Sequence, residues 1–165
     1  MGKIRSDPGI VWRGMKSLNQ LILSKYGPKF RAYNLVLLLT TIGRKSGLSR
    51  VTPLQYEEDQ GLFYIGSARG VYADWYLNIR ACPEVEVQVK ERRFRAVAEP
   101  VSDPQRVADF FEIRLKRHPL FVGLLMRLEG LPWRYTRADL ESFAAQKAMV
   151  VLHPFDEGEE FRSFS

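Results

Sequence analysis

Apolar residues between positions 35 and 101 recur at every second position or in short runs, which is the pattern of β-strands. The clearest alternation lies at residues 84–90, where three valines alternate with charged and amide side chains. Pro53 interrupts another strand, which indicates an edge, a bulge or a ligand contact. Turns at residues 43–47, 57–61 and 91–93 join hairpin pairs. The pattern predicts about six antiparallel strands, at residues 35–42, 50–57, 62–67, 84–90, 94–101 and 148–153, the first buried on both faces.

Helical spacing is found on both sides of these strands. Apolar residues three and four apart predict an amphipathic helix over residues 10–26, ending at Gly27-Pro28. This helix either packs on the body of the domain, or contacts a membrane or closes over the active site. Further helices are expected at residues 74–80, 104–118, 120–130 and 136–146, with N-caps from Asp74, Asp103 and Thr136.

Hairpin pairs without a strand–helix–strand repeat favour a small α+β barrel over a Rossmann sheet. The chain has 165 residues and a hydrophobic fraction of 45%, which suits one domain with a core. We therefore expect a single domain over residues 1–165. It would contain the helix at about 10–26, the barrel at about 35–101, helices at about 104–146 and a last strand at about 148–153.

The distribution of charge indicates an anionic partner. Lys and Arg number 25 against 19 Asp and Glu, giving a net charge of +6, and no acidic residue lies between Asp7 and Glu57. A phosphorylated ligand, a membrane surface or nucleic acid fits such a field. The chain has no helix-turn-helix, zinc or RNA-recognition motif, so we expect no nucleic-acid partner.

Other residue counts bear on the compartment. Cys82 is the single cysteine, which excludes an intramolecular disulfide and fits a packing residue in a reducing compartment. The apolar runs at 35–39 and 120–126 are too short to span a bilayer. We expect a cytoplasmic protein, with membrane association through the 10–26 helix as an alternative. His118 and His153 lack ligand spacing, and we expect no metal site.

The turn Gly43-Arg44-Lys45-Ser46-Gly47 is the most informative segment. Its glycines allow positive φ, so backbone N–H groups can converge on an anion, and its cations and Arg50 add positive charge. The alternative is an ordinary polar hairpin turn. A second group comprises Ser67-Ala68-Arg69-Gly70 and Asp74-Trp75-Tyr76-Leu77-Asn78. It offers a cation for a phosphate and an indole that either packs on a planar ring or fixes the short helix.

Three segments, LLLTTIGRKSGLSRVTPLQY, YIGSARG and DWYLNIRACPEVEVQV, resemble in this order the deazaflavin (F420)-dependent nitroreductase family. The resemblance covers roughly residues 35–100. It implies a split β-barrel of the FMN-binding type, with mostly antiparallel strands and flanking helices. It also implies an oxidoreductase that transfers a hydride between coenzyme F420 and an organic acceptor such as a quinone or a nitroaromatic.

The same resemblance assigns coenzyme contacts to individual residues. The basic turn would grip the phosphate and acidic tail, the strand after it would lie beside the deazaflavin ring, and the second group would complete the site. The implied coenzyme-binding residues are Arg44, Lys45, Ser46, Gly47, Arg50, Thr52, Pro53, Leu54, Ala68, Arg69, Gly70, Trp75 and Asn78.

Hydride transfer requires the protein to bind and orient the coenzyme and to provide a dry cavity, because the coenzyme itself carries the hydride. Tyr56, Tyr72 and Tyr135 are the candidate proton donors to the reduced acceptor, with solvent as the alternative. A related split barrel that binds FMN or haem is the second reading, since the basic turn suits any phosphorylated isoalloxazine. The expected partner is a small-molecule hydride acceptor, and a homodimer is the candidate assembly.

Overall fold

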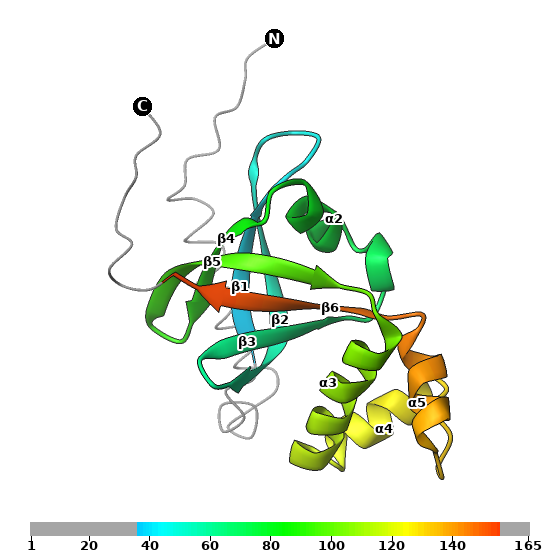
Figure 1. Cartoon of the computed structure of the whole chain (residues 1–165). Coiled ribbons are helices and arrows are strands. Elements are labelled where there is room, and N and C mark those ends of the chain that lie inside the picture. The colour runs from blue at the N-terminus through cyan, green and yellow to red at the C-terminus, as the bar shows by residue number, and fades with distance from the viewer. Residues whose placement is uncertain (1–35, 156–165) are drawn as a thin grey trace. The chain divides into compact units, whose positions relative to one another are not determined.

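The computed structural model describes residues 36–155, which form a closed antiparallel barrel with helices at its two ends (Figure 1). The strands close in the order β1-β2-β3-β6-β5-β4. They are β1 (Val36–Ile42), β2 (Ser49–Asp59), β3 (Leu62–Ser67), β4 (Glu84–Val89), β5 (Arg92–Val101) and β6 (Ala148–Pro154). The helices are η1 (Gly70–Tyr72), α2 (Asp74–Ala81), α3 (Pro104–Arg117), α4 (Phe121–Leu128) and α5 (Arg137–Ala144). This confirms the expected α+β barrel, whereas the helix predicted over residues 10–26 lies outside the described residues.

Strand β2 changes its neighbour along its length. Residues 49–55 pair with β1, whereas residues 56–59 pair with β3. Within residues 36–155, the first part of β2 therefore has a strand on one side only, and the opening between it and β3 splits the barrel. Pro53 is exposed in this part of the strand. An edge is one of the expected settings for a proline in a strand, because the missing N–H then costs little.

The barrel encloses one apolar cluster, and the helices cover another. Inward-facing residues such as Leu39 and Ile65 are fully buried in the first cluster. Val151 of β6 belongs to the second, together with Phe110 of α3 and Leu140 of α5. Strand β6 is thus buried on both faces, whereas buried and half-buried residues alternate in β1. The expectation that residues 35–42 are buried on both faces is wrong, because the layer of α3 and α5 covers β6 instead.

Two hairpin turns are shorter than the sequence predicted. Gln60 and Gly61 have φ of 49° and 79°, the left-handed pair used by two-residue hairpins. Strand β2 consequently continues through Asp59, and β5 begins at Arg92 rather than at residue 94. The two expected hairpins are present, but their turns are confined to residues 60–61 and 90–91, because the charged side chains beside them belong to the strand ends.

Two of the three predicted helix caps are confirmed. The Asp103 carboxylate accepts a hydrogen bond from the Arg106 N–H at 3.1 Å. Thr136 and Asp139 form a reciprocal capping box at the start of α5. The third prediction is wrong, because Ala73 is the N-cap of α2 and Asp74 is its first helical residue. The Asp74 carboxylate instead binds Arg44, a residue 30 positions earlier in the chain.

A buried ion cluster joins the barrel to the end of α3. Glu57 of β2 is only 4% exposed, and its carboxylate lies 3.4 Å from Arg114 and 3.3 Å from both Arg117 and His118. Burial lowers the pKa of the Arg114 guanidinium, and the adjacent Glu57 opposes that shift. Removing the carboxylate would leave a desolvated cation without its counter-charge. The cluster therefore fixes α3 against β2, a function that the sequence did not reveal.

Candidate functional site

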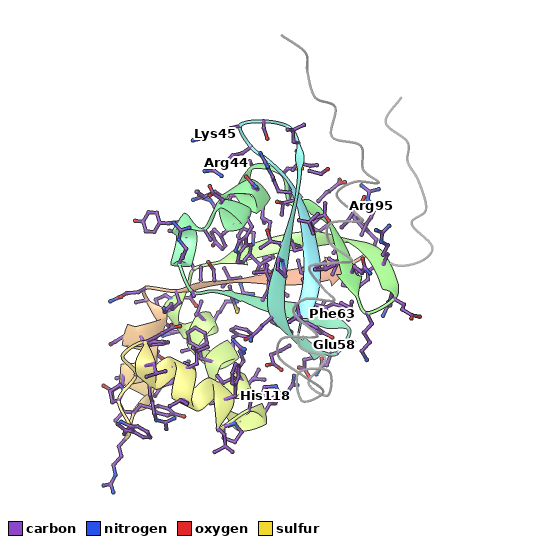
Figure 2. All side chains as sticks on the ribbon, turned by 180° about the vertical axis from the view of Figure 1, so that it is seen from behind. Arg44, Lys45, Glu58, Phe63, Arg95 and His118 are labelled. Atoms are coloured by element: carbon purple, nitrogen blue, oxygen red, sulfur yellow. The ribbon has the colours of Figure 1, made fainter. Side chains whose placement is uncertain are left out.

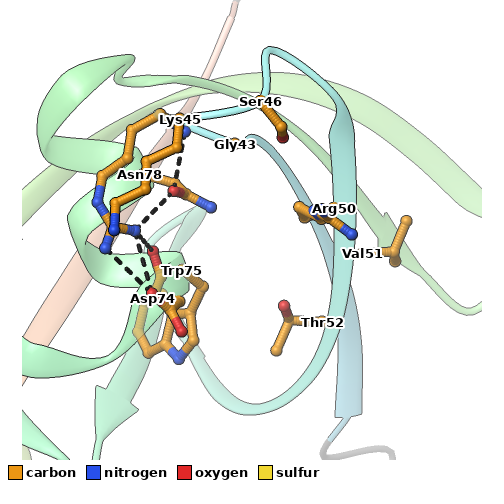
Figure 3. Close-up of a pocket in the computed structure, with 10 residues that line it drawn as sticks. Gly43, Lys45, Ser46, Arg50, Val51, Thr52, Asp74, Trp75 and Asn78 are labelled. Atoms are coloured by element: carbon orange, nitrogen blue, oxygen red, sulfur yellow. Dashed lines mark hydrogen bonds and ion pairs between the residues drawn. The ribbon is translucent and has the colours of Figure 1, made fainter. Parts of the chain in front are cut away.

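A pocket of about 440 Å³ lies between the β1–β2 turn, the start of β2 and helix α2 (Figure 3). Its volume is within the range of small-molecule sites. Polar and cationic side chains dominate its wall, with one indole. The lining residues are Gly43, Arg44, Lys45, Ser46, Arg50, Val51, Thr52, Asp74, Trp75 and Asn78.

The register of the β1–β2 hairpin explains why Arg50 and Thr52 reach this pocket. Arg50 lies opposite Thr41, and Thr52 lies opposite Leu39, whose side chain points into the barrel. Side chains alternate along a strand, so Arg50 and Thr52 continue the inward face of β2. They do so where β2 has not yet paired with β3. The inward face therefore emerges at the open end of the barrel as a polar surface.

Arg44 is held by helix α2. Its guanidinium donates to the Asp74 carboxylate from both Nη atoms at 3.1 Å and to the Asn78 Oδ1 at 3.1 Å. The Arg44 backbone N–H also donates to the Asn78 Oδ1 at 3.1 Å. Asn78 is buried and donates in turn to the Thr41 hydroxyl at 3.3 Å. Arg44 therefore ties the turn to α2 and to β1 in this structure.

The backbone of the turn is also satisfied internally. The N–H groups of Gly43, Ser46 and Gly47 donate to carbonyls within residues 43–48, at 2.8, 3.2 and 2.7 Å. A side chain at Gly43 would meet the Ser46 Oγ at 2.7 Å, so the turn closes tightly. The expectation that these N–H groups converge on an anion is wrong, because the turn uses them for its own hydrogen bonds. Side chains must then provide most of the anion recognition.

Lys45 and Arg50 are the cations that the pocket offers to a ligand. Both are exposed, and neither has a hydrogen-bond or ion-pair partner within residues 36–155. The Ser46 Oγ accepts from the Leu48 N–H at 3.3 Å, which leaves its own hydroxyl hydrogen to donate. Three cations against the single carboxylate of Asp74 leave the lining with a charge of 3 − 1 = +2. This combination suits a ligand with phosphate or carboxylate groups.

Trp75 provides the apolar part of the lining. It is half-buried and packs against the barrel core, with its ring edge-on to Tyr76 at 6.1 Å between centroids. Because its neighbours hold the indole in place, it offers a flat surface at the pocket and loses little side-chain entropy when a ligand binds. The two readings of the tryptophan are compatible here, since it packs the short helix and lines the pocket.

Seven of the implied coenzyme-binding residues line the pocket, and six lie elsewhere. The seven are Arg44, Lys45, Ser46, Arg50, Thr52, Trp75 and Asn78. The six are Gly47, Pro53, Leu54, Ala68, Arg69 and Gly70. Sequence reasoning missed Gly43, Val51 and Asp74 as lining residues. Val51 alternates with the inward-facing Arg50 and Thr52, so the hairpin register did not indicate it, and nothing local in the sequence pairs Asp74 with Arg44.

The segment from Ser67 to Gly70 has structural contacts of its own. The Ser67 hydroxyl donates to the Gly70 carbonyl at 2.7 Å, and the Ala68 carbonyl accepts from the Lys147 Nζ at 3.1 Å. Gly70 has φ of 59°, and a Cβ there would lie 2.7 Å from the Gln146 carbonyl oxygen. A side chain at this position is therefore excluded. Arg69, by contrast, is exposed.

None of the three candidate tyrosines lines this pocket. Tyr56 is buried in the barrel core, and burial raises its pKa, with further contributions from Glu58 and Glu57. Its hydroxyl is therefore protonated at neutral pH. Tyr72 is 77% exposed, and Tyr135 packs against the second apolar cluster.

None of the helices within residues 36–155 is long and apolar enough to cross a membrane. In the same part of the chain, no group of three or more His, Cys, Asp and Glu residues could hold a metal ion.

Fold and site together define a split β-barrel with a cationic, indole-lined pocket at its open end. The family model described as F420H(2)-dependent quinone reductase matches residues 13–128. The chain therefore belongs to the F420H(2)-dependent quinone reductase family.

One curated relative is an F420H(2)-dependent quinone reductase of Mycobacterium tuberculosis (strain ATCC 25618 / H37Rv). It is 38% identical over 68 residues, which cover 39% of this chain and 46% of the relative. The match thus spans about half the length of that relative. Among solved structures, a conserved hypothetical protein from Mycobacterium tuberculosis has a TM-score of 0.54 at 16% identity, covering 74% of each chain. This structural likeness supports the fold alone.

Proposed function

We propose that this chain binds coenzyme F420 in the pocket beside the basic turn and passes its hydride to a quinone-type acceptor. One observation carries the proposal: Lys45 and Arg50 have no partner among residues 36–155 and stand beside Trp75 in one pocket. Membership of the F420H(2)-dependent quinone reductase family supports F420 as the ligand of that pocket.

The residues present fit such a coenzyme. F420 combines a phosphate and an acidic tail with a planar ring, and the pocket combines an indole surface with cations that have no partner within residues 36–155. A volume of about 440 Å³ suits a part of this ligand, with the remainder extending into solvent. When bound, the deazaflavin supplies the hydride, which the protein has no group to provide.

The chain's own residues would bind and orient the coenzyme. Lys45, Arg50 and the Ser46 hydroxyl would hold the anionic groups, since charge-assisted hydrogen bonds are the stronger ones. Arg44 would act as a positioning residue, because its bonds to Asp74 and Asn78 keep the turn and α2 at a fixed separation. Thr52 and Trp75 would then meet the less polar part of the coenzyme.

The proton for the reduced acceptor is assigned to solvent. The buried phenol of Tyr56 lies in the barrel core, and neither Tyr72 nor Tyr135 lines the pocket. The basic turn that forms one wall of the pocket is exposed, so water reaches it without a relay. Protonation of the reduced acceptor therefore needs no general-acid catalysis by a tyrosine.

A quinone is the acceptor class to test first. The assay is anaerobic oxidation of reduced F420, followed by absorbance, with a menaquinone analogue, a nitroaromatic and a small polar enone as acceptors. We expect the menaquinone analogue to give the fastest oxidation. Clear turnover of the enone without turnover of any quinone would refute the acceptor assignment, and absence of F420 binding would refute the proposal as a whole.

A further inference from the structure

Helix α4 carries large apolar side chains on its exposed face as well as on its buried face. Val122, Gly123 and Met126 are buried against the neighbouring helices. The opposite stripe follows helical spacing and remains in water. It comprises Leu120, Phe121, Leu124, Leu125 and Leu128, with exposed fractions from 40% to 87%. Exposed apolar side chains that cluster in this way mark a surface that binds a protein or a membrane.

Trp133 extends the stripe beyond the end of α4. It is 76% exposed, and the Arg127 guanidinium lies 4.9 Å from its ring centroid. Gly123 leaves room for this arrangement, since a Cβ there would come within 2.6 Å of the Arg127 Nη1. The stripe and Trp133 together are called the α4 surface below.

Cations flank the α4 surface along the chain. Lys116 in the last turn of α3 and Arg134 beside Trp133 are exposed, and neither has an ion-pair partner in the part of the chain that the structure describes. Arg127 adds a third positive charge. The acidic residue at the end of α4, Glu129, is neutralised by Lys147 at 2.7 Å.

We propose that the α4 surface docks on an anionic phospholipid bilayer. An apolar stripe with a tryptophan and flanking cations matches the boundary between headgroups and acyl chains. A second copy of the chain fits less well, because a two-fold contact would bring the same cations from both copies together. In Figure 1, α4 lies with α3 and α5 at the end of the barrel away from α2, so docking would leave the pocket accessible.

The test is co-sedimentation of the full chain with vesicles of phosphatidylcholine containing 30% phosphatidylglycerol, compared with phosphatidylcholine alone. The variant combines Leu124→Ser with Leu128→Ser, both at exposed positions. Vesicle partitioning should fall at least roughly tenfold, since two leucines would no longer leave water on binding. The control is Val97→Ser, which changes an exposed apolar residue of β5 and should bind like the unmodified chain.

A second variant tests the charges. Lys116→Gln with Arg134→Gln should reduce binding to the anionic vesicles by roughly tenfold or more at low salt, because each cation near the surface contributes. Binding to vesicles of phosphatidylcholine alone should change little. Equal loss on both kinds of vesicle would contradict the assigned role of charge.

Other outcomes would overturn the proposal. Vesicle binding that survives the two leucine substitutions would place the contact on another part of the chain. Self-association in sedimentation velocity that those substitutions abolish would assign the surface to a second copy. If the leucine variant fails to fold, quenching of Trp133 by brominated lipid, with Trp133→Phe as the reference, decides the same question. No arm of this test uses the coenzyme, so its result is independent of the proposed function.

Discussion

At the scale of single residues, the cations of the pocket divide into two kinds. Arg44 is bound by Asp74 and Asn78, whereas Lys45 and Arg50 have no partner within residues 36–155. The sequence presents all three as equivalent members of a basic turn. The position of α2, which depends on contacts between residues distant in the chain, makes Arg44 pair with Asp74. Lys45 and Arg50 are not paired in this way and can bind a ligand.

Lys45→Ala and Arg50→Ala should each weaken F420 binding by roughly tenfold at low salt, since each removes a charge-assisted contact. The loss should shrink at high salt because exposed charges are screened. Fluorescence titration at two ionic strengths measures both effects. Lys116→Ala removes an equal charge from α3 and should bind F420 normally. Unchanged affinity in both pocket variants would remove the basic turn from the site.

Asp74→Asn should change the affinity for F420 in the opposite direction and strengthen binding. The substitution removes the one negative charge of the lining and loosens the hold on Arg44. Affinity for the anionic coenzyme should rise about threefold, as expected for a partly screened charge at contact distance. The stability cost should stay below about 1 kcal/mol, because the Asp74 side chain is 80% exposed and its ion pair is screened by water. Glu91→Gln, in the β4–β5 turn, is the matched control. Weaker binding by Asp74→Asn would show that the ion pair is needed for the site.

At the scale of elements, the contact between β2 and α3 depends on a buried carboxylate. Glu57→Gln should lower the free energy of unfolding by about 3 kcal/mol, because it leaves the desolvated Arg114 without its counter-charge. Urea unfolding measures the change. Glu58→Gln is the control, since Glu58 is the next residue of the strand and its side chain is exposed. Equal stability of the two variants would show that the cluster contributes little.

The Glu99 carboxylate links β5 to α3 and β6 and makes stability depend on pH. Its hydrogen bond from Arg106 is the largest cause of a lowered pKa, followed by that from His153. A lowered pKa in the folded state stabilises above the unfolded-state pKa, and this contribution is lost as pH falls through the folded-state value. Glu99→Gln should therefore lose stability at neutral pH and show a shallower acid decline. The effect should stay below about 1 kcal/mol because the pair is exposed. Melting temperatures from pH 3 to 7 test it, and parallel curves for the two proteins would contradict it.

The elements that the sequence predicted well are those with local causes. Alternating valines defined β4, and the caps of α3 and α5 depend on side chains three positions apart. The errors at Glu57 and Asp74 have a common physical reason. Both are carboxylates that look solvent-directed in the sequence and are paired with arginines more than 25 positions away. Contacts of that range are set by topology, which local pattern does not encode.

At the scale of the whole molecule, the split in the barrel explains where a ligand can bind. Closed pairing fills the interior with apolar side chains, whereas residues 49–55 of β2 have no second strand beside them in the part of the chain that the structure describes. The inward face becomes polar in that part, with Thr41 and Arg50 in register. The family resemblance in the sequence indicated most of these residues. It did not indicate that the N–H groups of Gly43, Ser46 and Gly47 are already bonded, because that depends on the closed conformation of the turn.

A competitive titration of the full chain with F420, FMN and haem measures which coenzyme the pocket binds. F420 should bind most tightly, FMN should not displace it at equal concentration, and the affinity for F420 should fall as ionic strength rises. Binding of FMN or haem without binding of F420 would assign the pocket to a different coenzyme and refute the proposed function.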